Sequence, residues 1–318
     1  MKAVVIRKFG PPDVMNIEEV DKPAISCDQI LVRVYYSSVN PVDWKIRNGS
    51  LKFLIGSRFP MVLGFDVAGE VIETGTGVTR FRKGDRVFGM LHYRQRGAYA
   101  EYIAAKEDYL AIIPENLDFK EAAAVPLAGL TAYQALHYKA NIKSGDTVLV
   151  NGASGGVGSF AVQIAMAAGA SVTAVCGTDN LERVKALGVD KVTDYRRQDF
   201  IDLPDQYDII FDAAGKRSFF QVRRNLKAGG RYVTTLPNVA NIFSSSLIPF
   251  MSLFGYRKKS SLINVHPSGL DLNSLGLLIK QGRLFPLIDQ VFPLEKIREA
   301  HTYSETEHAR GKIVIEIL

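Results

Sequence analysis

The chain has few cysteines, no long hydrophobic run and no dense block of one charge. Its 318 residues include two cysteines, Cys27 and Cys176, which are far apart and lack the spacing of metal ligands. This excludes a zinc–thiolate cluster and argues against a disulfide framework. A reducing compartment fits, and we expect a cytoplasmic protein.

No window of about 20 residues is apolar enough to span a bilayer. The nearest, residues 236–255, is interrupted by Pro, Asn and Ser. A strand-like run, KAVVI, directly follows Met1, so we expect no signal or transit peptide.

The net charge of +6 is spread along the chain. The densest basic runs, Arg196–Arg197 and 257–259, are short, so we expect no nucleic-acid partner and favour an anionic small ligand. The histidines show no mutual spacing typical of a metal site or a catalytic triad, and we expect surface or structural roles for all five: His92, His137, His266, His301 and His308.

The length suits two domains, and the pattern changes near residue 119. Before that point, short alternating runs separated by Gly, Pro and Asp predict strands at 2–6, 30–39, 66–75, 84–90 and 97–105. Residues 119–138 are helical in pattern apart from Pro126.

Strand and helix patterns then alternate, which is typical of a doubly wound parallel sheet in an α/β protein. The predicted strands are 146–150, 171–176, 191–195, 207–214, 231–236 and 261–265, and the predicted helices are 159–169, 180–188, 219–230 and 272–282. The end of the chain returns to a β pattern at 289–294 and 312–318. We therefore predict a β domain over 1–122, joined by 284–318, and a nucleotide-binding domain over 123–283.

A glycine loop, NGASGGVG, lies between the strand pattern TVLV and a helix pattern. In this context Gly152-x-x-Gly155-x-x-Gly158 predicts a dinucleotide site. Backbone N–H groups and the helix N-terminus bind the pyrophosphate. The predicted binding residues are Gly152, Ser154, Gly155, Gly156, Val157 and Gly158.

The end of the next strand decides between NAD and NADP. The run SVTAVCGTDN places Gly177 and Thr178 where an NAD site would hold a carboxylate, although Asp179 follows closely. Tyr195 and Arg196 can close on the adenosine phosphate, or they form an ordinary exposed turn. We predict NADP(H), with Thr178, Tyr195 and Arg196 in the cofactor site.

Together these motifs resemble the medium-chain dehydrogenase/reductase superfamily. The runs SSVNPVDWKIRNG, FPMVLGFDVAGEV, GVTRFRKGDRVFG, GAYAEY, AAAVPLAGLTAYQAL and NGASGGVG follow the family's order over almost the whole chain. Within it, the chain is similar to the zinc-independent quinone oxidoreductase branch, in particular the chloroplast-envelope and reticulon-interacting group. The resemblance implies a GroES-like β domain, a Rossmann domain and an active site in the cleft between them.

The sequence departs from the zinc alcohol dehydrogenases at the positions of their ligands. Asn40 and Phe65 align with a catalytic Cys and His of those enzymes, and a second Cys falls near Leu127. None of these three side chains replaces a thiolate or imidazole. We therefore predict no metal site and a hydride acceptor that is easier to reduce than a simple ketone.

Candidate catalytic residues lie in Asn40-Pro41-Val42-Asp43-Trp44-Lys45. Asn40 is expected to hydrogen-bond the substrate oxygen or the nicotinamide ribose, or else to form a turn before proline. Lys45 is a candidate proton or hydrogen-bond donor, and a ribose or surface contact is its alternative. Asp43 either orients Lys45 or the adjacent backbone, or is purely structural.

Trp44 and Phe65 are candidates for an aromatic wall on which a planar acceptor stacks, or for ordinary packing. The resemblance brings Thr131 and Lys312 near the cofactor; a helix N-cap is the alternative for Thr131. The apolar run 242–260 either covers the substrate pocket, forms core or a dimer contact, or touches a membrane.

The sequence thus predicts an NADPH-dependent, metal-free reductase of a small hydrophobic quinone or an α,β-unsaturated carbonyl. The resemblance implies a homodimer. The alternative is a non-catalytic NADPH-binding sensor or docking protein.

Overall fold

The computed structural model describes residues 1–93, 95, 97–235, 237, 239–251 and 257–318. Its contacts divide the chain into two compact units. Unit 1 comprises Met1–Leu130, His266–Gly282 and Pro286–Leu318; unit 2 comprises Thr131–Val265 and Arg283–Phe285.

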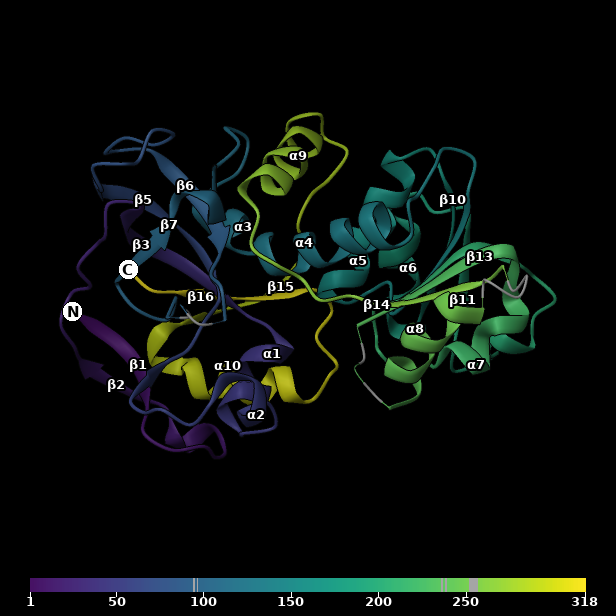
Figure 1. Ribbon diagram of the computed structural model, residues 1–318, viewed down its shortest axis with the longest axis horizontal. Helices are drawn as coiled ribbons and strands as arrows, with labels where there is room; N and C mark the ends of the chain where they lie inside the picture. Colours follow the sequence, from purple (N-terminus) through teal and green to yellow (C-terminus); the bar gives the residue numbers. More distant parts are fainter. Residues whose placement is uncertain (94, 96, 236, 238, 252–256) are drawn as a thin grey trace. The chain divides into compact units, whose positions relative to one another are not determined.

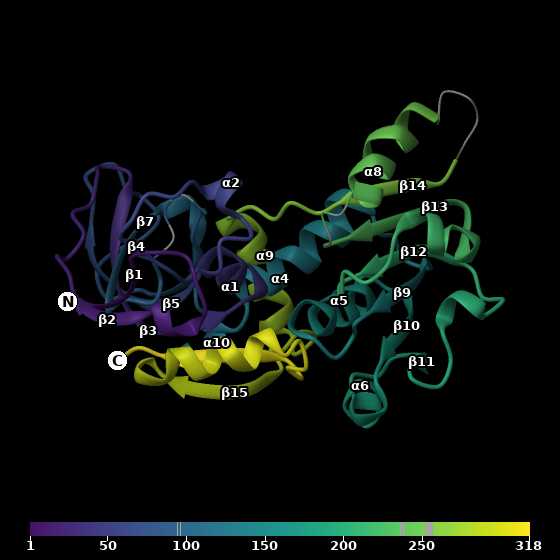
Figure 2. The same cartoon turned by 90° about the horizontal axis from the view of Figure 1, so that it is seen from below.

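Unit 2, teal to green in Figure 1, is built on a six-stranded parallel sheet. Its strand order, β11-β10-β9-β12-β13-β14, can be followed in Figure 2. Its strands are β9 (Thr147–Asn151), β10 (Ser171–Cys176), β11 (Lys191–Asp194), β12 (Tyr207–Asp212), β13 (Leu226–Thr234) and β14 (Lys259–Leu262). The strand order reverses between β9 and β12, which is where doubly wound folds bind dinucleotides. The predicted Rossmann-type sheet is confirmed.

Helices accompany these strands because each apolar strand is buried and each crossover needs a covering layer. They are α5 (Gly156–Ala167), α6 (Leu181–Lys185), α7 (Phe219–Val222) and α8 (Val239–Met251), with α4 (Pro126–Gln134) entering unit 2 from unit 1 and continuing as a π-helical turn, η3 (Ala135–Lys139). Short 3₁₀ turns are η4 (Thr178–Asn180), η5 (Phe200–Asp202) and η6 (Arg223–Asn225).

The helix predicted over 219–230 is wrong for most of its length. Helix α7 has only four residues, and β13 already begins at Leu226. Leu226 pairs with Tyr207 and is buried in the core of unit 2. Gly229 adopts a φ of +79°, which a helix does not accommodate, so the strand pairing outweighs the helical pattern.

Unit 1 is a β domain with two sheets. One is antiparallel, in the order β2-β1-β4; the other has seven strands, in the order β15-β16-β3-β5-β6-β8, with β7 also pairing β3. The strands are β1 (Lys2–Ile6), β2 (Asn16–Glu19), β3 (Gln29–Val39), β4 (Met61–Val62), β5 (Asp66–Thr74), β6 (Arg86–Met90), β7 (Tyr102–Lys106), β8 (Leu110–Ile112), β15 (Ile288–Pro293) and β16 (Lys312–Glu316). Its helices are η1 (Pro12–Val14), α1 (Pro41–Arg47), α2 (Lys52–Ile55), η2 (Glu107–Tyr109), α3 (Phe119–Ala123), α9 (Gly269–Lys280), η8 (Leu294–Lys296) and α10 (Ile297–Glu305).

The end of the chain returns to unit 1. Strand β16 pairs antiparallel with β3, with Ile313 opposite Val39. Helix α10 packs against α1, so purple and yellow segments lie side by side in Figure 1. This return brings Lys312 beside residues from the first quarter of the sequence.

The residues around α9 belong to a different unit from the one predicted: residues 266–282 group with unit 1, although the sequence predicts them in the nucleotide-binding domain. Asn116 Nδ2 donates to the carbonyl of Ile279 at 2.9 Å, and α9 packs against β8, which groups 266–282 with unit 1. Phe285 groups with unit 2, where its backbone exchanges two hydrogen bonds with the Gln163 side chain.

Helix α8 contains much of the apolar run 242–260 and packs against β14 (Figure 2), where the Ser244 and Ser260 hydroxyls are 2.9 Å apart. Ile242 and Phe243 are about half exposed. Residues 252–256 of the run lie outside the described residues. Within the described part of the chain, no helix combines the length and apolarity needed to cross a membrane.

Candidate active site

The glycine loop joins β9 to α5 as predicted. Gly152 has a φ of +84°, and a Cβ on Gly158 would lie 2.0 Å from the Gly152 carbonyl oxygen. A Cβ on Gly155 would meet only that same oxygen, at an ordinary 3.5 Å. The first two of these observations explain why the turn requires glycine at 152 and 158.

The loop leaves donors for a ligand. Gly155 is the N-cap of α5, so the N–H groups of Gly156, Val157 and Gly158 have no intrahelical acceptor. Gly156 and Val157 are partly exposed. Ser154 is also partly exposed, and its hydroxyl forms no hydrogen bond with another described residue.

The switch point between β9 and β12 is closed by two polar residues that the sequence analysis missed. Asn151 Nδ2 donates to Asp212 Oδ1 at 2.7 Å, and the N–H groups of Ala213 and Ala214 donate to the Asn151 carbonyl. Burial raises the pKa of Asp212. Each of these residues ends an apolar strand, which is the signal that would have indicated them.

Thr178, Tyr195 and Arg196 meet at the carboxyl ends of β10 and β11. Thr178 Oγ1 donates to Asp194 Oδ2 at 2.6 Å, which together with further donors lowers the pKa of that carboxyl. The Tyr195 ring lies beside Gly177, within 3.3 Å of where a Cβ would be. Arg196 pairs with Asp179 at 2.9 Å, and both side chains are about half exposed.

Thr131 lies inside α4 and is buried, so the alternative of a helix N-cap is wrong. Pro126 occupies the first position of this helix, where its missing N–H costs nothing. The helix therefore starts six residues earlier than a cap at Thr131 would require.

In unit 1, α1 presents the residues predicted to be catalytic. Asn40 is the N-cap of α1, and its N–H donates to Asp43 Oδ2 at 2.8 Å. Asp43 is fully buried, and burial raises its pKa from 3.8 to about 7. The Asp43 carboxylate therefore orients the adjacent Asn40 backbone and also interacts with Tyr99, and among the described residues it has no hydrogen bond or ion pair with Lys45.

A closed ring of hydrogen bonds joins three side chains, and we call it the Asn40–Asp66–Lys312 ring. Asn40 Nδ2 donates to Asp66 Oδ2 at 2.8 Å, while Lys312 Nζ donates to Asn40 Oδ1 at 2.5 Å and to Asp66 Oδ2 at 3.2 Å. All three are buried. Sequence reasoning named Asn40 and Lys312 but missed Asp66, a carboxyl group that begins the apolar run DVAGEV.

Two further donors fix Asp66. Ser38 Oγ donates to Oδ2 at 2.5 Å, and the N–H of Leu127 donates to Oδ1 at 2.7 Å. The zinc-ligand positions at 40, 65 and 127 are thereby brought together around Asp66. Asn, Phe and Leu side chains do not form a zinc ligand set, and the described residues contain no group of three or more His, Cys, Asp or Glu arranged for a metal ion.

The remaining predicted residues of unit 1 differ in exposure. Lys45 Nζ lies 5.3 Å from the centre of the Trp44 ring, and among the described residues it has no acidic partner. Both side chains are partly exposed. Phe65 is buried next to Asp66, with 3% of its surface exposed.

A second buried polar cluster links α1 to α10. Arg47 donates to the Gly10 carbonyl, contacts His301 Nδ1 at 3.3 Å and pairs with Glu305. His301 is fully buried, and burial, aided by the Arg47 charge, lowers its pKa from 6.5 to about 3. The cluster ties α10 to α1 and gives His301 a structural role.

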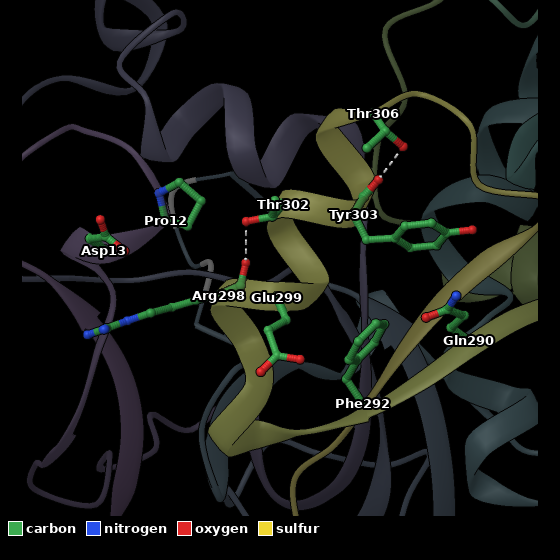
Figure 3. Close-up of a pocket in the computed structure, with 9 residues that line it drawn as sticks. All are labelled: Pro12, Asp13, Gln290, Phe292, Arg298, Glu299, Thr302, Tyr303 and Thr306. Carbon is green, nitrogen blue, oxygen red and sulfur yellow. Dashed lines mark hydrogen bonds between the residues drawn. The ribbon is translucent and has the colours of Figure 1, made fainter.

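An open pocket of about 660 Å³ lies elsewhere on unit 1, between η1, β15 and α10 (Figure 3). Phe292 and Glu299 point into it, whereas the Arg298 guanidinium is used by Met15 and Asn16. None of the predicted site residues lines this pocket.

Comparison with known proteins agrees with this arrangement. Residues 26–115 match the alcohol dehydrogenase GroES-like domain, and residues 187–315 match the zinc-binding dehydrogenase family. The second match does not include positions 40, 65 or 127. The chain is 35% identical to a chloroplastic quinone-oxidoreductase homolog of Spinacia oleracea, over 96% of this chain and 95% of that protein.

Two other proteins are similar over nearly the whole chain. The chloroplastic NADPH-dependent alkenal/one oxidoreductase of Arabidopsis thaliana is 36% identical, with 99% of this chain and 79% of that protein covered. The structure of the quinone oxidoreductase from Coxiella burnetii superposes with a TM-score of 0.89 at 33% identity, covering 100% of this chain and 99% of that one. The chain is therefore an oxidoreductase and belongs to the quinone oxidoreductase branch of the medium-chain dehydrogenase/reductase superfamily.

Proposed function

We propose that this protein is an NADPH-dependent, zinc-independent reductase of quinones or α,β-unsaturated carbonyls. The single observation that carries the proposal is the Asn40–Asp66–Lys312 ring. Its Asn40 stands where the zinc enzymes hold their catalytic cysteine, and the ring contains the buried Lys312 amine and no thiolate or imidazole.

The residues of unit 2 fit the cofactor. The unpaired N–H groups at the start of α5 and the Ser154 hydroxyl suit a pyrophosphate. Gly152 and Gly158 keep the backbone close enough for that contact. NADPH would supply a hydride, and the protein would orient the acceptor and stabilise the charge that develops on it.

The preference for NADPH over NADH is supported by the end of β10. That strand carries no carboxylate at its end, and Gly177 and Thr178 follow it. Arg196 is half exposed, and its pair with the equally exposed Asp179 contributes little free energy. A 2′-phosphate can therefore recruit Arg196 at small cost.

The acceptor class follows from the side chains at positions 40, 65 and 127, which do not form a ligand set for zinc as a Lewis acid. A quinone or enone spreads the incoming charge onto a distant oxygen, whereas a simple ketone needs a stronger electrophile. Lys45, which has no acidic partner among the described residues, is a candidate proton donor. The names of relatives, quinone oxidoreductase and alkenal/one oxidoreductase, agree with this class.

The test measures oxidation of NADPH, with NADH in parallel, against a panel of quinones, enones and simple ketones, with and without a strong metal chelator. We expect chelator-insensitive turnover that prefers NADPH and omits the ketones. Inhibition by the chelator would overturn zinc independence. Tight NADPH binding without turnover on any acceptor would favour the sensor or docking protein. The cytoplasmic location and the homodimer stay predictions.

A further inference from the structure

Asp66 is the most heavily hydrogen-bonded side chain of unit 1 among those at the candidate site, and it has no exposed surface. Its carboxylate accepts from Ser38, Asn40, Leu127 and Lys312, at distances from 2.5 to 3.2 Å. A carboxylate offers about four acceptor sites. The acceptor capacity of Asp66 is therefore used up by the protein itself.

Lys312 and Asn40, the partners of Asp66 in the ring, still have N–H donors to offer. An ammonium group has three N–H donors, and Lys312 directs two of them, to Asn40 Oδ1 and Asp66 Oδ2. A carboxamide has two N–H donors, and Asn40 directs one, to Asp66 Oδ2. Among the described residues, each side chain thus keeps one N–H without an acceptor, while the acceptors of the ring are occupied.

Buried donors without an acceptor are unfavourable, so they mark a place where an acceptor belongs. Asn40 and Lys312 keep 2% and 3% of their surface exposed, which suits contact with one atom of a ligand. The ring also fixes which end of the Asn40 carboxamide is the donor, because Lys312 can only donate to its oxygen.

We propose that Asp66 is a positioning residue that orients Asn40 and Lys312 as a two-donor site for the oxygen of the reduced acceptor. This inference rests on the proposed function. Hydride addition to the β-carbon of an enone breaks the C=C π bond, oxidises NADPH to NADP⁺ and leaves an enolate with its charge on oxygen. The N–H groups of Asn40 and Lys312 stabilise that oxyanion until a proton from Lys45 or solvent reaches the α-carbon.

The proposal predicts that losing the site affects acceptors according to the basicity of their oxyanion. An enolate holds more localised charge than a hydroquinone anion, so it depends more on charged hydrogen-bond donors. Asp66→Asn places an amide against two donor groups and disturbs both. We expect kcat to fall about 100-fold for an enone and about tenfold for a quinone, with the KM for NADPH little changed.

Two variants accompany Asp66→Asn. Asn40→Ala removes one donor but keeps the Asp66–Lys312 pair and the cap that Asp43 provides to the Asn40 N–H, so it serves if Asp66→Asn does not fold. Ser37→Ala is the matched control, because Ser37 is equally buried and its hydroxyl donates to the backbone carbonyl of Asp66 at 2.6 Å and not to the carboxylate. It should lower stability and leave the ratio of enone to quinone kcat unchanged.

The experiment measures kcat and KM for wild type and the three variants with one enone and one quinone, and thermal unfolding for each protein. A larger loss for the enone in Asp66→Asn and Asn40→Ala, but not in Ser37→Ala, supports the proposal. Equal losses for both acceptors, or a change confined to the KM for NADPH, would overturn the donor site while leaving the proposed function standing. A wild type that turns over neither acceptor would overturn both.

Discussion

The glycine loop of unit 2 and the Asn40–Asp66–Lys312 ring of unit 1 differ in exposure and in how far their hydrogen bonds are already satisfied within the protein. The loop presents the N–H groups of the partly exposed Gly156 and Val157, which have no hydrogen-bond partner within the described part of the chain. The ring is buried, and every acceptor it contains is already bonded. An open site can bind a large, charged molecule, whereas a closed one can act on a single atom.

The same contrast decides how much of each site the sequence predicts. The loop residues lie within seven positions of one another, and their spacing between a strand and a helix is a local pattern. The ring joins Asn40 to Lys312 across 272 positions and adds a carboxyl group from β5. No local period encodes such a meeting, and only the family resemblance brought Lys312 into the prediction.

The largest expected effect concerns Asp43, one hydrogen bond away from the ring. Because its pKa is about 7 when folded and 3.8 ordinarily, the folded protein retains a proton between about pH 4 and pH 7 that the unfolded chain has lost. The stability from Asp43 is therefore complete below about pH 4 and is lost as the pH rises to about 7. In urea unfolding, the free energy of unfolding of Asp43→Asn relative to wild type should rise over that range, by up to about 4 kcal/mol.

His301 provides the opposing control. Its pKa of about 3 lies below the ordinary 6.5, so its contribution is complete above about pH 6.5 and is lost as the pH falls. The free energy of unfolding of His301→Gln relative to wild type should therefore rise as the pH falls below about 6.5. A difference between Asp43→Asn and wild type that does not vary with pH would show that Asp43 titrates normally and that the ring's surroundings are wetter than described.

The next effect tests the loop. Gly158→Ala forces a Cβ within 2.0 Å of the Gly152 carbonyl oxygen, so the turn must open. We expect a loss of about 2–3 kcal/mol in stability and a fall in NADPH affinity of at least tenfold. Gly155→Ala is the matched control, because its Cβ would lie at an ordinary 3.5 Å from the Gly152 carbonyl oxygen. It should leave the unfolding temperature nearly unchanged. Equal destabilisation by both variants would mean that the loop is not held by that contact.

The smallest effect concerns the selectivity for the cofactor. Arg196→Ala should reduce the preference for NADPH over NADH by about tenfold, corresponding to about 1.4 kcal/mol, because a charged hydrogen bond to the 2′-phosphate is lost. Arg197→Ala removes the same charge from an 80% exposed neighbour and should change the preference little. If both variants act alike, the selectivity comes from the general field of the two arginines and not from a defined contact. The assay is the ratio of kcat/KM for the two cofactors.

Particular residues show where the sequence misled. The pattern FFQVRRNLKAGG has helical spacing, yet Leu226 belongs to β13 because its pairing with Tyr207 buries it in the core. Asp66 was overlooked although its neighbour Phe65 was considered, because an isolated carboxyl at the start of a strand gives no sign of its four partners. The Rossmann sheet and the β domain were predicted correctly, since both follow from periods and turns that are local.

The strand that carries Lys312 has a consequence for how the protein folds. Residues Thr131–Val265 form nearly all of unit 2 as one continuous segment, while unit 1 is assembled from three separated segments. Strand β16 enters between β15 and β3, so the larger sheet of unit 1 closes only across a chain loop of more than 270 residues. Such long-range pairing is slow. A folding intermediate with unit 2 formed and β3 still lacking its partner is therefore expected, and it would bind dinucleotide before it could reduce anything.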